Sequence, residues 1–424
     1  MENLTPKTAA PLDVVIVGAG PAGLALACAL SDAGLSVRLL EQQPLAALET
    51  PGDDGREIAI THRSRQSMER LGLWDALPVD AVAPLREARV LDGDHAQALR
   101  FLAPASESDP LGWLVPNHRI RAAALVAARR RPGVALQCDT QVVGIELGDE
   151  RASVLLADGK REDALLVVAA DSRFSRVRRM AGIGASMRDF GRSVIVACMA
   201  HEHAHDGVAR ECFGDGNTLA LLPLNDRRSS AVVTVPADAV GDWLAMPASE
   251  FAARIEAQSG ARLGALRQVG ERHHYPLVGV YAQRFCARRF ALVGDAAVGM
   301  HPVTAHGWNL GLQGVETLAS ELRAARLSGR GDIGDRRALE AFERAHRLAT
   351  WPLYAGTNAL VSLFTDDSPT AKLARRFVLD AAARMPVVSD LVKTIVTRQL
   401  MGGAPAARSR RTPARRPGRP ARLA

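Results

Sequence analysis

Short apolar runs separated by polar and glycine-rich stretches divide most of the chain into strand-sized and helix-sized segments. Strand-like runs occupy residues 14–17, 36–40, 165–168 and 290–293. We expect the first and the last to be fully buried strands, because a continuous apolar run bounded by turn signals is typical of a strand covered on both faces. Residues 22–33 are good helix formers, and a long helix is expected from about residue 309. The pattern predicts an α/β fold.

The turn between the first strand and the first helix is rich in glycine, over residues 18–23 (GAGPAG). Gly18 permits a tight turn, Gly20 lets a pyrophosphate approach the backbone, and Gly23 lets the helix pack closely on the strand. The helix N-terminus adds free N–H groups and a positive dipole end. The second strand ends in Glu41, 18 residues after Gly23, where a carboxylate binds an adenosine ribose and disfavours a 2′-phosphate. This segment predicts FAD or NAD rather than NADP, and does not choose between them.

A second turn follows the apolar run at residues 290–293, which ends in Gly294-Asp295 and leads through a loop into the long helix. An acid at the end of a strand can accept hydrogen bonds from a polyol such as the ribityl chain of a flavin. A helix N-terminus aimed at the pyrimidine edge of a flavin stabilises negative charge on the reduced ring. This segment favours FAD over NAD.

Three stretches together resemble the FAD fingerprints of the group A flavoprotein monooxygenases, which share the para-hydroxybenzoate hydroxylase-like fold. The family's second fingerprint usually reads G-D-A-A-H-x-x-x-P-x-x-G-Q-G-x-N, and residues 294–309 read GDAAVGMHPVTAHGWN. Its middle fingerprint reads A-D-G-x-x-S-x-V-R, and residues 170–178 read ADSRFSRVR. The resemblance covers roughly residues 12–401. Stretches such as THRSRQSMERLGLWDAL are similar to the ubiquinone-biosynthesis hydroxylases of the UbiH/UbiI type, and GMHPVTAHGWNLGL with AADSRFS looks most like the UbiM subgroup.

The resemblance implies that FAD is held by residues of all three fingerprints and by two arginines. The expected cofactor-binding residues are Gly18, Gly20, Gly23, Glu41, Arg56, Arg121, Asp171, Gly294, Asp295, Pro302, Gly307 and Asn309. Asp295 would bind the ribityl chain, Pro302 would line the flavin, and Gly307 with Asn309 would approach its pyrimidine side. Arg56 and Arg121 are weaker assignments, because isolated arginines usually lie on the surface.

In the middle fingerprint, Asp171 is expected to face the FAD near its pyrophosphate or ribityl region. Arg178 is expected to anchor the segment, while Arg173, Arg176 and Arg179 are expected to be solvated.

Three departures from the family pattern stand out. Ser172 replaces a glycine, which raises the question of a positive φ at that residue. Val298 replaces a histidine, and Ala305-His306 replaces Gly-Gln. No catalytic residue is assigned, because the flavin carries the chemistry. His301 and His306 are the candidate proton donors in the loop.

The resemblance also implies an architecture and an activity. We expect a Rossmann-like FAD-binding domain (residues 12–76, 115–184 and 282–345) interleaved with an α+β substrate domain on a mostly antiparallel sheet (residues 77–114 and 185–281). A C-terminal helical segment (346–401) and a disordered tail (402–424) would follow. The implied activity is hydroxylation of the aromatic ring of a prenylated ubiquinone precursor through a flavin C4a-hydroperoxide, with O₂ as oxidant and NAD(P)H as the expected electron donor. The alternatives are a hydroxylase of a soluble phenol and a non-catalytic flavoprotein subunit of a quinone-biosynthesis complex.

Composition changes this picture little. Seven arginines in residues 402–424 account for the whole net charge of +7, so the body gives no indication of nucleic-acid binding. Five scattered cysteines without a C-x-x-C pair indicate a reducing cytoplasm. No apolar run has the length of a membrane span, although peripheral contact with the inner membrane face or with a quinone-biosynthesis complex would suit a lipid-tailed substrate.

Histidine-rich stretches are the remaining candidates for a site. His201, His203 and His205 in HEHAHD are more typical of a turn in the family's substrate sheet than of a metal site, and no metal is expected. The RHHY stretch (272–275) is interpreted as strand surface. Apolar positions at helical spacing in residues 351–400 are expected to pack on the body, with interfacial contact as the alternative.

Overall fold

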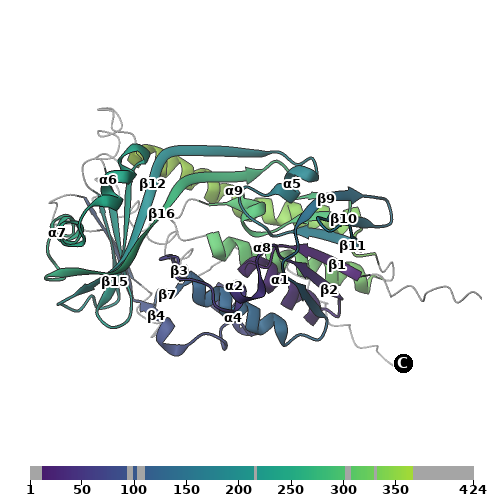
Figure 1. The fold of residues 1–424 in the computed structure, drawn as a ribbon, viewed down its shortest axis with the longest axis horizontal. Helices are drawn as coiled ribbons and strands as arrows, with labels where there is room; N and C mark the ends of the chain where they lie inside the picture. Colours follow the sequence, from purple (N-terminus) through teal and green to yellow (C-terminus); the bar gives the residue numbers. More distant parts are fainter. Residues whose placement is uncertain are drawn as a thin grey trace, which may run out of the picture.

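The computed structural model describes residues 12–92, 99–102, 110–213, 217–300, 307–328 and 332–365. Two large sheets lie at opposite ends of the molecule (Figure 1). The long strands β12 (Ala185–His201) and β16 (Leu266–Ala282) belong to one sheet and extend along one side of the molecule toward the other. Within the described residues each large sheet has eight strands, and a third, small sheet has three.

The first sheet has a parallel core with the strand order β17-β18-β11-β1-β2-β8. The strands from β18 to β8 are parallel, and the apolar residues at the centre of β1 and β11 are inaccessible to solvent. A parallel sheet is covered on both faces, which explains why these strands are continuous apolar runs. Its strands are β1 (Leu12–Val17), β2 (Val37–Leu40), β8 (Val134–Gln137), β9 (Val142–Leu147), β10 (Ala152–Leu156), β11 (Arg161–Ala169), β17 (Cys286–Ala287) and β18 (Phe290–Leu292).

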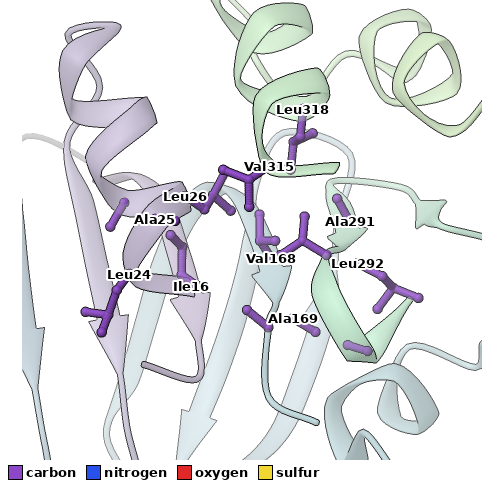
Figure 2. Packing of buried hydrophobic residues seen from close by; sticks show 14 of the residues in the cluster. Ile16, Leu24, Ala25, Leu26, Val168, Ala169, Ala291, Leu292, Val315 and Leu318 are labelled. Carbon is purple, nitrogen blue, oxygen red and sulfur yellow. The ribbon is translucent and has the colours of Figure 1, made fainter. Parts of the chain in front are cut away.

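Helices α1 (Pro21–Asp32) and α8 (Gly307–Leu327) pack on each other and on this sheet. Figure 2 shows Leu26 of α1 and Val315 of α8 meeting above Val168 of β11. The other helices are α2 (Leu45–Glu49), α3 (His62–Arg70), α4 (Asn117–Arg129), α5 (Arg176–Met180), α6 (Val240–Ala245), α7 (Ala248–Gln258) and α9 (Arg336–Thr365). None of the helices in the described ranges is long and apolar enough to cross a membrane.

The second large sheet is antiparallel except where β13 pairs with β5, and its order is β19-β16-β12-β15-β14-β13-β5-β6. One face packs on α6 and α7 around Phe251, which is completely buried. The opposite face carries Val194, Val196 and Tyr275. The strands not yet given are β5 (Glu87–Asp92), β6 (Leu99–Leu102), β13 (Val208–Phe213), β14 (Thr218–Pro223), β15 (Arg228–Pro236) and β19 (Val298–Gly299).

A small antiparallel sheet, which the sequence analysis did not foresee, has the order β3-β7-β4. Its strands are β3 (Glu57–Ile60), β4 (Ala83–Leu85) and β7 (Gly112–Pro116). The loop before β3 reaches the second large sheet, since a Cβ on Gly55 would lie 2.7 Å from His273 Cδ2. The small sheet is therefore next to the Val194 and Val196 face of the second large sheet, which is called the substrate-side sheet below because it lies in the predicted substrate domain.

The predicted α/β class and the predicted elements are confirmed, with boundaries shifted by up to four residues. The run at residues 14–17 lies inside β1, the helix predicted at 22–33 is α1, and the long helix expected from about Asn309 begins at Gly307. Helix α9 runs through the boundary expected at residue 346. The rest of the predicted C-terminal segment and the arginine-rich tail lie outside the described residues.

Candidate functional site

The three fingerprints meet because their strands are neighbours that end at the same edge of the parallel sheet. Val17 of β1 is level with Ala169 of β11, and Ala169 is level with Leu292 of β18. The ladder continues one residue further, since the Ala170 N–H donates to Val17 O at 2.8 Å and the Val293 N–H donates to Ala169 O at 3.0 Å. Parallel strands bind ligands beyond this carboxyl edge. The structure thus brings Gly18, Asp171 and Gly294 together.

The glycine turn leaves no room for side chains at two positions. Gly18 has φ +106°, and a Cβ there would lie 2.6 Å from Ala170 O and 2.8 Å from Asp171 Cα. A Cβ on Gly23 would lie 2.0 Å from Gly18 O. Gly20 differs, because nothing lies within 4 Å of its Cβ position at the start of α1. The turn is tight against the sheet and open at the helix N-terminus, as a pyrophosphate site requires.

Glu41 follows β2 and is fixed by the same turn. Its Oε2 accepts the Ala19 N–H at 2.7 Å, and its Oε1 accepts the Gln43 N–H at 2.9 Å. Each carboxylate oxygen has a second lone pair, so the half-buried group can still accept hydroxyl groups of a ribose.

Asp171 packs directly on the glycine turn and is only partly satisfied. Its Oδ2 accepts the Arg176 N–H at 3.0 Å, whereas its buried Oδ1 has no hydrogen-bond partner among the described residues. A buried acceptor without a donor is unfavourable in the protein alone, and a ligand hydroxyl group would satisfy it. Ser172 is absent from the non-glycine residues with positive φ in the described ranges. The glycine of the family pattern is therefore not required here for backbone conformation.

The four arginines of this segment have different environments. Arg178 is buried, and its Nη1 donates to Arg173 O at 3.2 Å and to Ala296 O at 2.8 Å, which confirms that it anchors the fingerprint. Arg176 and Arg179 are exposed. The prediction for Arg173 was wrong: its Nη2 lies 3.3 Å from Asp295 Oδ2, and its Nη1 donates to Val278 O. The turn after Asp171 directs this side chain back toward the end of β18, where it pairs with Asp295 instead of pointing into solvent.

Gly294 and Asp295 lie at the end of β18, beside both helices. Gly294 has φ +60°, and its Cβ position is 2.9 Å from the Ala22 side chain and its Cα is 3.5 Å from the Cβ position of Gly311. The side chain of Asp295 is 42% exposed and remains accessible to a polyol in spite of its pairing with Arg173. Val298, in place of the family histidine, is buried in β19.

Asn309 connects the start of α8 to the end of β3. Its Nδ2 donates to Ala59 O at 2.8 Å, and its Oδ1 accepts the Thr61 N–H at 3.2 Å. Gly307, at the first position of α8, has nothing within 4 Å of its Cβ position. Pro302, His301, His306 and Ala305 lie outside the described residues.

Arg56 lies where the small sheet meets the substrate-side sheet. Its guanidinium pairs with Asp54 at 2.6 Å and lies 5.3 Å from the centre of the Tyr275 ring. Its pKa is raised, since the hydrogen bond and charge of Asp54, with a smaller contribution from Asp295, outweigh its burial. Burial also opposes ionisation of Asp54, but hydrogen bonds from Arg56 and Asn117 outweigh it and lower the Asp54 pKa. Arg121 is half-buried on α4 and makes no ion pair within the described ranges.

Several residues of this junction were not predicted from the sequence. Asn117 Nδ2 donates to Asp54 Oδ2 at 2.7 Å, and the Tyr275 hydroxyl donates to Asp54 O at 2.6 Å. Interpreting RHHY as strand surface was right for His274, which is exposed, but wrong for His273 and Tyr275, which turn inward. Period-two alternation along β16 was the available signal, because alternate residues of a strand face opposite sides.

Glu57, at the start of β3, is a further residue that the sequence analysis did not single out. Its Oε2 is buried and has no hydrogen-bond partner among the described residues. Burial, reinforced by the charges of Asp53 and Asp54, raises the pKa of Glu57 to about 8. The carboxyl group is therefore mostly protonated at neutral pH.

The histidines of the HEHAHD stretch make local hydrogen bonds. His201 bonds to His203 O and to Ser229 Oγ, and His205 bonds to Leu224 O. In the part of the chain that the structure describes, no group of three His, Cys, Asp or Glu side chains is arranged to hold a metal ion.

The described residues fit FAD. The glycine turn provides an open helix N-terminus, Glu41 a fixed carboxylate, Asp171 an unsatisfied buried acceptor and Asp295 an accessible one. These groups lie along one edge of one sheet, as an extended dinucleotide requires.

Comparison with known proteins agrees with this geometry. The FAD binding domain family matches residues 11–354. The chain is 44% identical over 394 residues to ubiquinone hydroxylase UbiM of Neisseria meningitidis, covering 92% of this chain and 84% of that protein. It is 38% identical to ubiquinone hydroxylase UbiL of Rhodospirillum rubrum, covering 92% and 89% of the two chains.

The fold has solved relatives as well. The crystal structure of p-nitrophenol 4-monooxygenase PnpA from Pseudomonas putida superimposes with a TM-score of 0.74 at 19% identity, covering 93% of this chain and 99% of that one. At this identity the likeness concerns the fold alone. The sequence matches carry the assignment further: the chain belongs to the FAD binding domain family, and within it to the FAD-dependent monooxygenases that include the ubiquinone hydroxylases.

Proposed function

We propose that this chain is an FAD-dependent monooxygenase that hydroxylates the aromatic ring of a prenylated ubiquinone precursor. The carrying observation is the 44% identity to a ubiquinone hydroxylase over 92% of the chain, together with the convergence of the three fingerprints at one sheet edge. A second ubiquinone hydroxylase at 38% identity supports the same substrate class.

In this proposal the residues of the three fingerprints, together with Glu41, hold the cofactor. Gly18, Gly20 and Gly23 cradle the pyrophosphate, Glu41 binds the adenosine ribose, and Asp171 and Asp295 bind hydroxyl groups further along the cofactor. When bound and reduced by a donor such as NAD(P)H, FAD activates O₂ for transfer to the ring.

The protein holds the remaining parts in place. Asn309 fixes the start of α8 against β3, where the flavin's pyrimidine side would lie. Arg56 supplies a cation between Asp295 and the face of the substrate-side sheet that carries Tyr275. The apolar part of that face, which includes Val194 and Val196, would exclude water from the ring.

The test has two parts. Purified protein is expected to be yellow with one FAD per chain, and to oxidise NAD(P)H faster when a prenylated phenol is added. Expression in a strain lacking its own ring hydroxylase is expected to restore the hydroxylated quinone, as detected by mass spectrometry. Colourless protein that stays apo with added FAD would contradict the proposal. Flavin-loaded protein that never restores the quinone would favour a non-catalytic subunit.

We also propose that the enzyme acts from the cytoplasm and associates peripherally with the inner membrane, where a prenylated substrate is dissolved. Leu348 and Trp351 on α9 support this, with 77% and 54% of their surfaces exposed. All five cysteines are free, which suits a reducing compartment. Co-sedimentation with anionic vesicles checks the association, and a Leu348→Ser/Trp351→Ser double variant is expected to reduce it. Equal sedimentation of both proteins would contradict this role of α9.

A further inference from the structure

Two buried oxygen atoms lack partners at the junction between the small sheet and the substrate-side sheet. They are Glu57 Oε2 on β3 and Ser230 Oγ on β15, and neither has a hydrogen-bond partner among the described residues. Ser230 itself is only 2% exposed. Native proteins satisfy most buried polar atoms, so two such atoms in one area indicate that something outside the chain hydrogen-bonds to them.

Strand register places the two atoms in the same area. Ser230 is directly opposite Cys198 of β12, and opposed residues of an antiparallel pair share one face of the sheet. That face is the one with Val194 and Val196, next to the small sheet. The charge of Glu57 raises the pKa of the Cys198 thiol, after the larger effect of burial, which puts the Glu57 carboxyl group near this strand pair.

The same strand connects Glu57 to the expected flavin position. Ala59, two residues after Glu57, accepts the hydrogen bond from Asn309. Residues two apart in a strand lie about 7 Å from each other. On the other side of Glu57, Gly55 packs on His273 of β16. Glu57 therefore lies between the start of α8, where the pyrimidine side of the cofactor is proposed, and the sheet face with Val194 and Val196, which is where we expect the aromatic substrate.

The charged surroundings of Glu57 keep it a hydrogen-bond donor. Burial, together with the charges of Asp53 and Asp54 and against that of Arg228, raises its pKa to about 8. The pKa of the Cys198 thiol also responds to the charge of Glu57. A protonated carboxyl group donates one hydrogen bond to an oxygen acceptor, which a carboxylate cannot do.

We propose that Glu57 and Ser230 are substrate-positioning residues that hydrogen-bond oxygen substituents of the aromatic ring, Glu57 as donor. This inference rests on the proposed function and deepens it, because it assigns the groups that orient an oxygenated ring in front of the flavin. A site built to hydrogen-bond a ring oxygen rejects an analogue without it, since its own polar groups would stay unsatisfied.

The fold and the proposed hydrogen bond both favour the protonated form of Glu57. The unfolded chain releases this proton above its ordinary pKa of 4.5, while the folded chain keeps it up to about pH 8. Stability contributed by this group is therefore present below pH 4.5 and is lost as the pH rises toward 8. Glu57→Gln removes this loss, so its Tm is expected to exceed that of the wild type most clearly near pH 8.

Binding to the oxidised holoenzyme tests the inference, with a short-chain prenylated methoxyphenol as probe and the flavin absorbance change as readout. Glu57→Leu is expected to raise the dissociation constant about tenfold with unchanged flavin content, the loss of about one hydrogen bond. Glu57→Gln retains a donor, so it is expected to bind like the wild type at pH 7 and to lack the weakening that the wild type shows above pH 8. A probe with a methyl group in place of the phenolic hydroxyl is expected to bind wild type and Glu57→Leu alike.

Neighbouring serines provide a matched control. Ser230→Ala is expected to weaken binding several-fold, whereas Ser229→Ala is not, because Ser229 faces the other side of β15 and bonds to His201. Unchanged binding of the phenol by Glu57→Leu or Ser230→Ala, in variants with normal flavin content, would overturn the inference. Failure of the wild type to bind the phenol at all would instead contradict the proposed function.

Discussion

The FAD cradle and the junction beside the substrate-side sheet are built by different means. In the cradle, backbone atoms are so close that glycine is required: a Cβ at Gly23 would lie 2.0 Å from Gly18 O. In the junction, side chains such as Asp54, Arg56 and Tyr275 hold one another through hydrogen bonds and charge. Backbone contacts restrict the residue type at a position, whereas a side-chain network depends on how distant strands align.

Gly23→Ala tests the cradle most severely. The added methyl group overlaps Gly18 O, and the turn cannot move away because Gly18 itself contacts Ala170. We expect a loss of about 4 kcal/mol or more in unfolding free energy, or failure to accumulate folded protein. Urea unfolding and flavin content measure this. Retention of both would show that the cradle is not limited by backbone contact.

Gly20→Ala is the matched control within the same turn. Because its Cβ position is free of neighbours, the apo protein is expected to keep its Tm. The methyl group would instead occupy the space that a pyrophosphate needs, and FAD affinity is expected to fall at least tenfold. If Gly20→Ala lowered apo stability as much as Gly23→Ala, Gly20 would be required for packing and not for ligand access.

Arg178→Ala tests whether the middle fingerprint is held by a side chain. The buried guanidinium bonds the carbonyl oxygens of Arg173 and Ala296, and its loss would leave both without that donor. We expect a cost of about 3 kcal/mol, because hydrogen bonds to a charged group are the stronger ones and the orphaned acceptors stay buried. Denaturant unfolding checks it, with Arg179→Ala, an exposed neighbour, expected to be nearly neutral.

The difference between backbone contacts in the cradle and side-chain contacts in the junction explains how much of each region could be predicted from the sequence. Gly18, Gly23 and Gly294 could be found because tight turns restrict residue type within a short local window, and the apolar runs of β1, β11 and β18 showed where the turns would meet. The pairing of Arg173 with Asp295 could not be found, since 122 residues separate them and the turn geometry decides the direction of the side chain. Glu57 and Tyr275 depend on strand register across more than two hundred residues, which no local pattern contains.

A buried histidine beneath helix α8 makes the stability of the fold depend on pH. His346 of α9 is almost completely buried beneath it, against Gly314, and burial lowers the His346 pKa from 6.5 to about 4. The folded chain holds this histidine neutral, while the unfolded chain binds a proton below pH 6.5. Stability from this group is therefore full above pH 6.5 and is lost as the pH falls toward 4, by about 3 kcal/mol in total. His346→Gln is expected to remove that slope in unfolding measurements, while His274→Gln, an exposed control, keeps it.

Asp171→Asn is expected to change stability only slightly, and it tests whether a side chain of the turn binds the cofactor. Its Oδ2 already accepts the Arg176 N–H, while its buried Oδ1 has no partner among the described residues. Asp171→Asn keeps the shape and one acceptor but replaces the other oxygen by a donor. We expect apo stability within about 1 kcal/mol of the wild type and FAD affinity roughly tenfold lower, the loss of about one hydrogen bond. Denaturant unfolding of the apo protein measures the stability, and flavin titration measures the affinity. Reduced stability with unchanged affinity would make Asp171 a residue of the turn alone, and Glu41 and Asp295 would be the side-chain acceptors that remain for the cofactor at this edge.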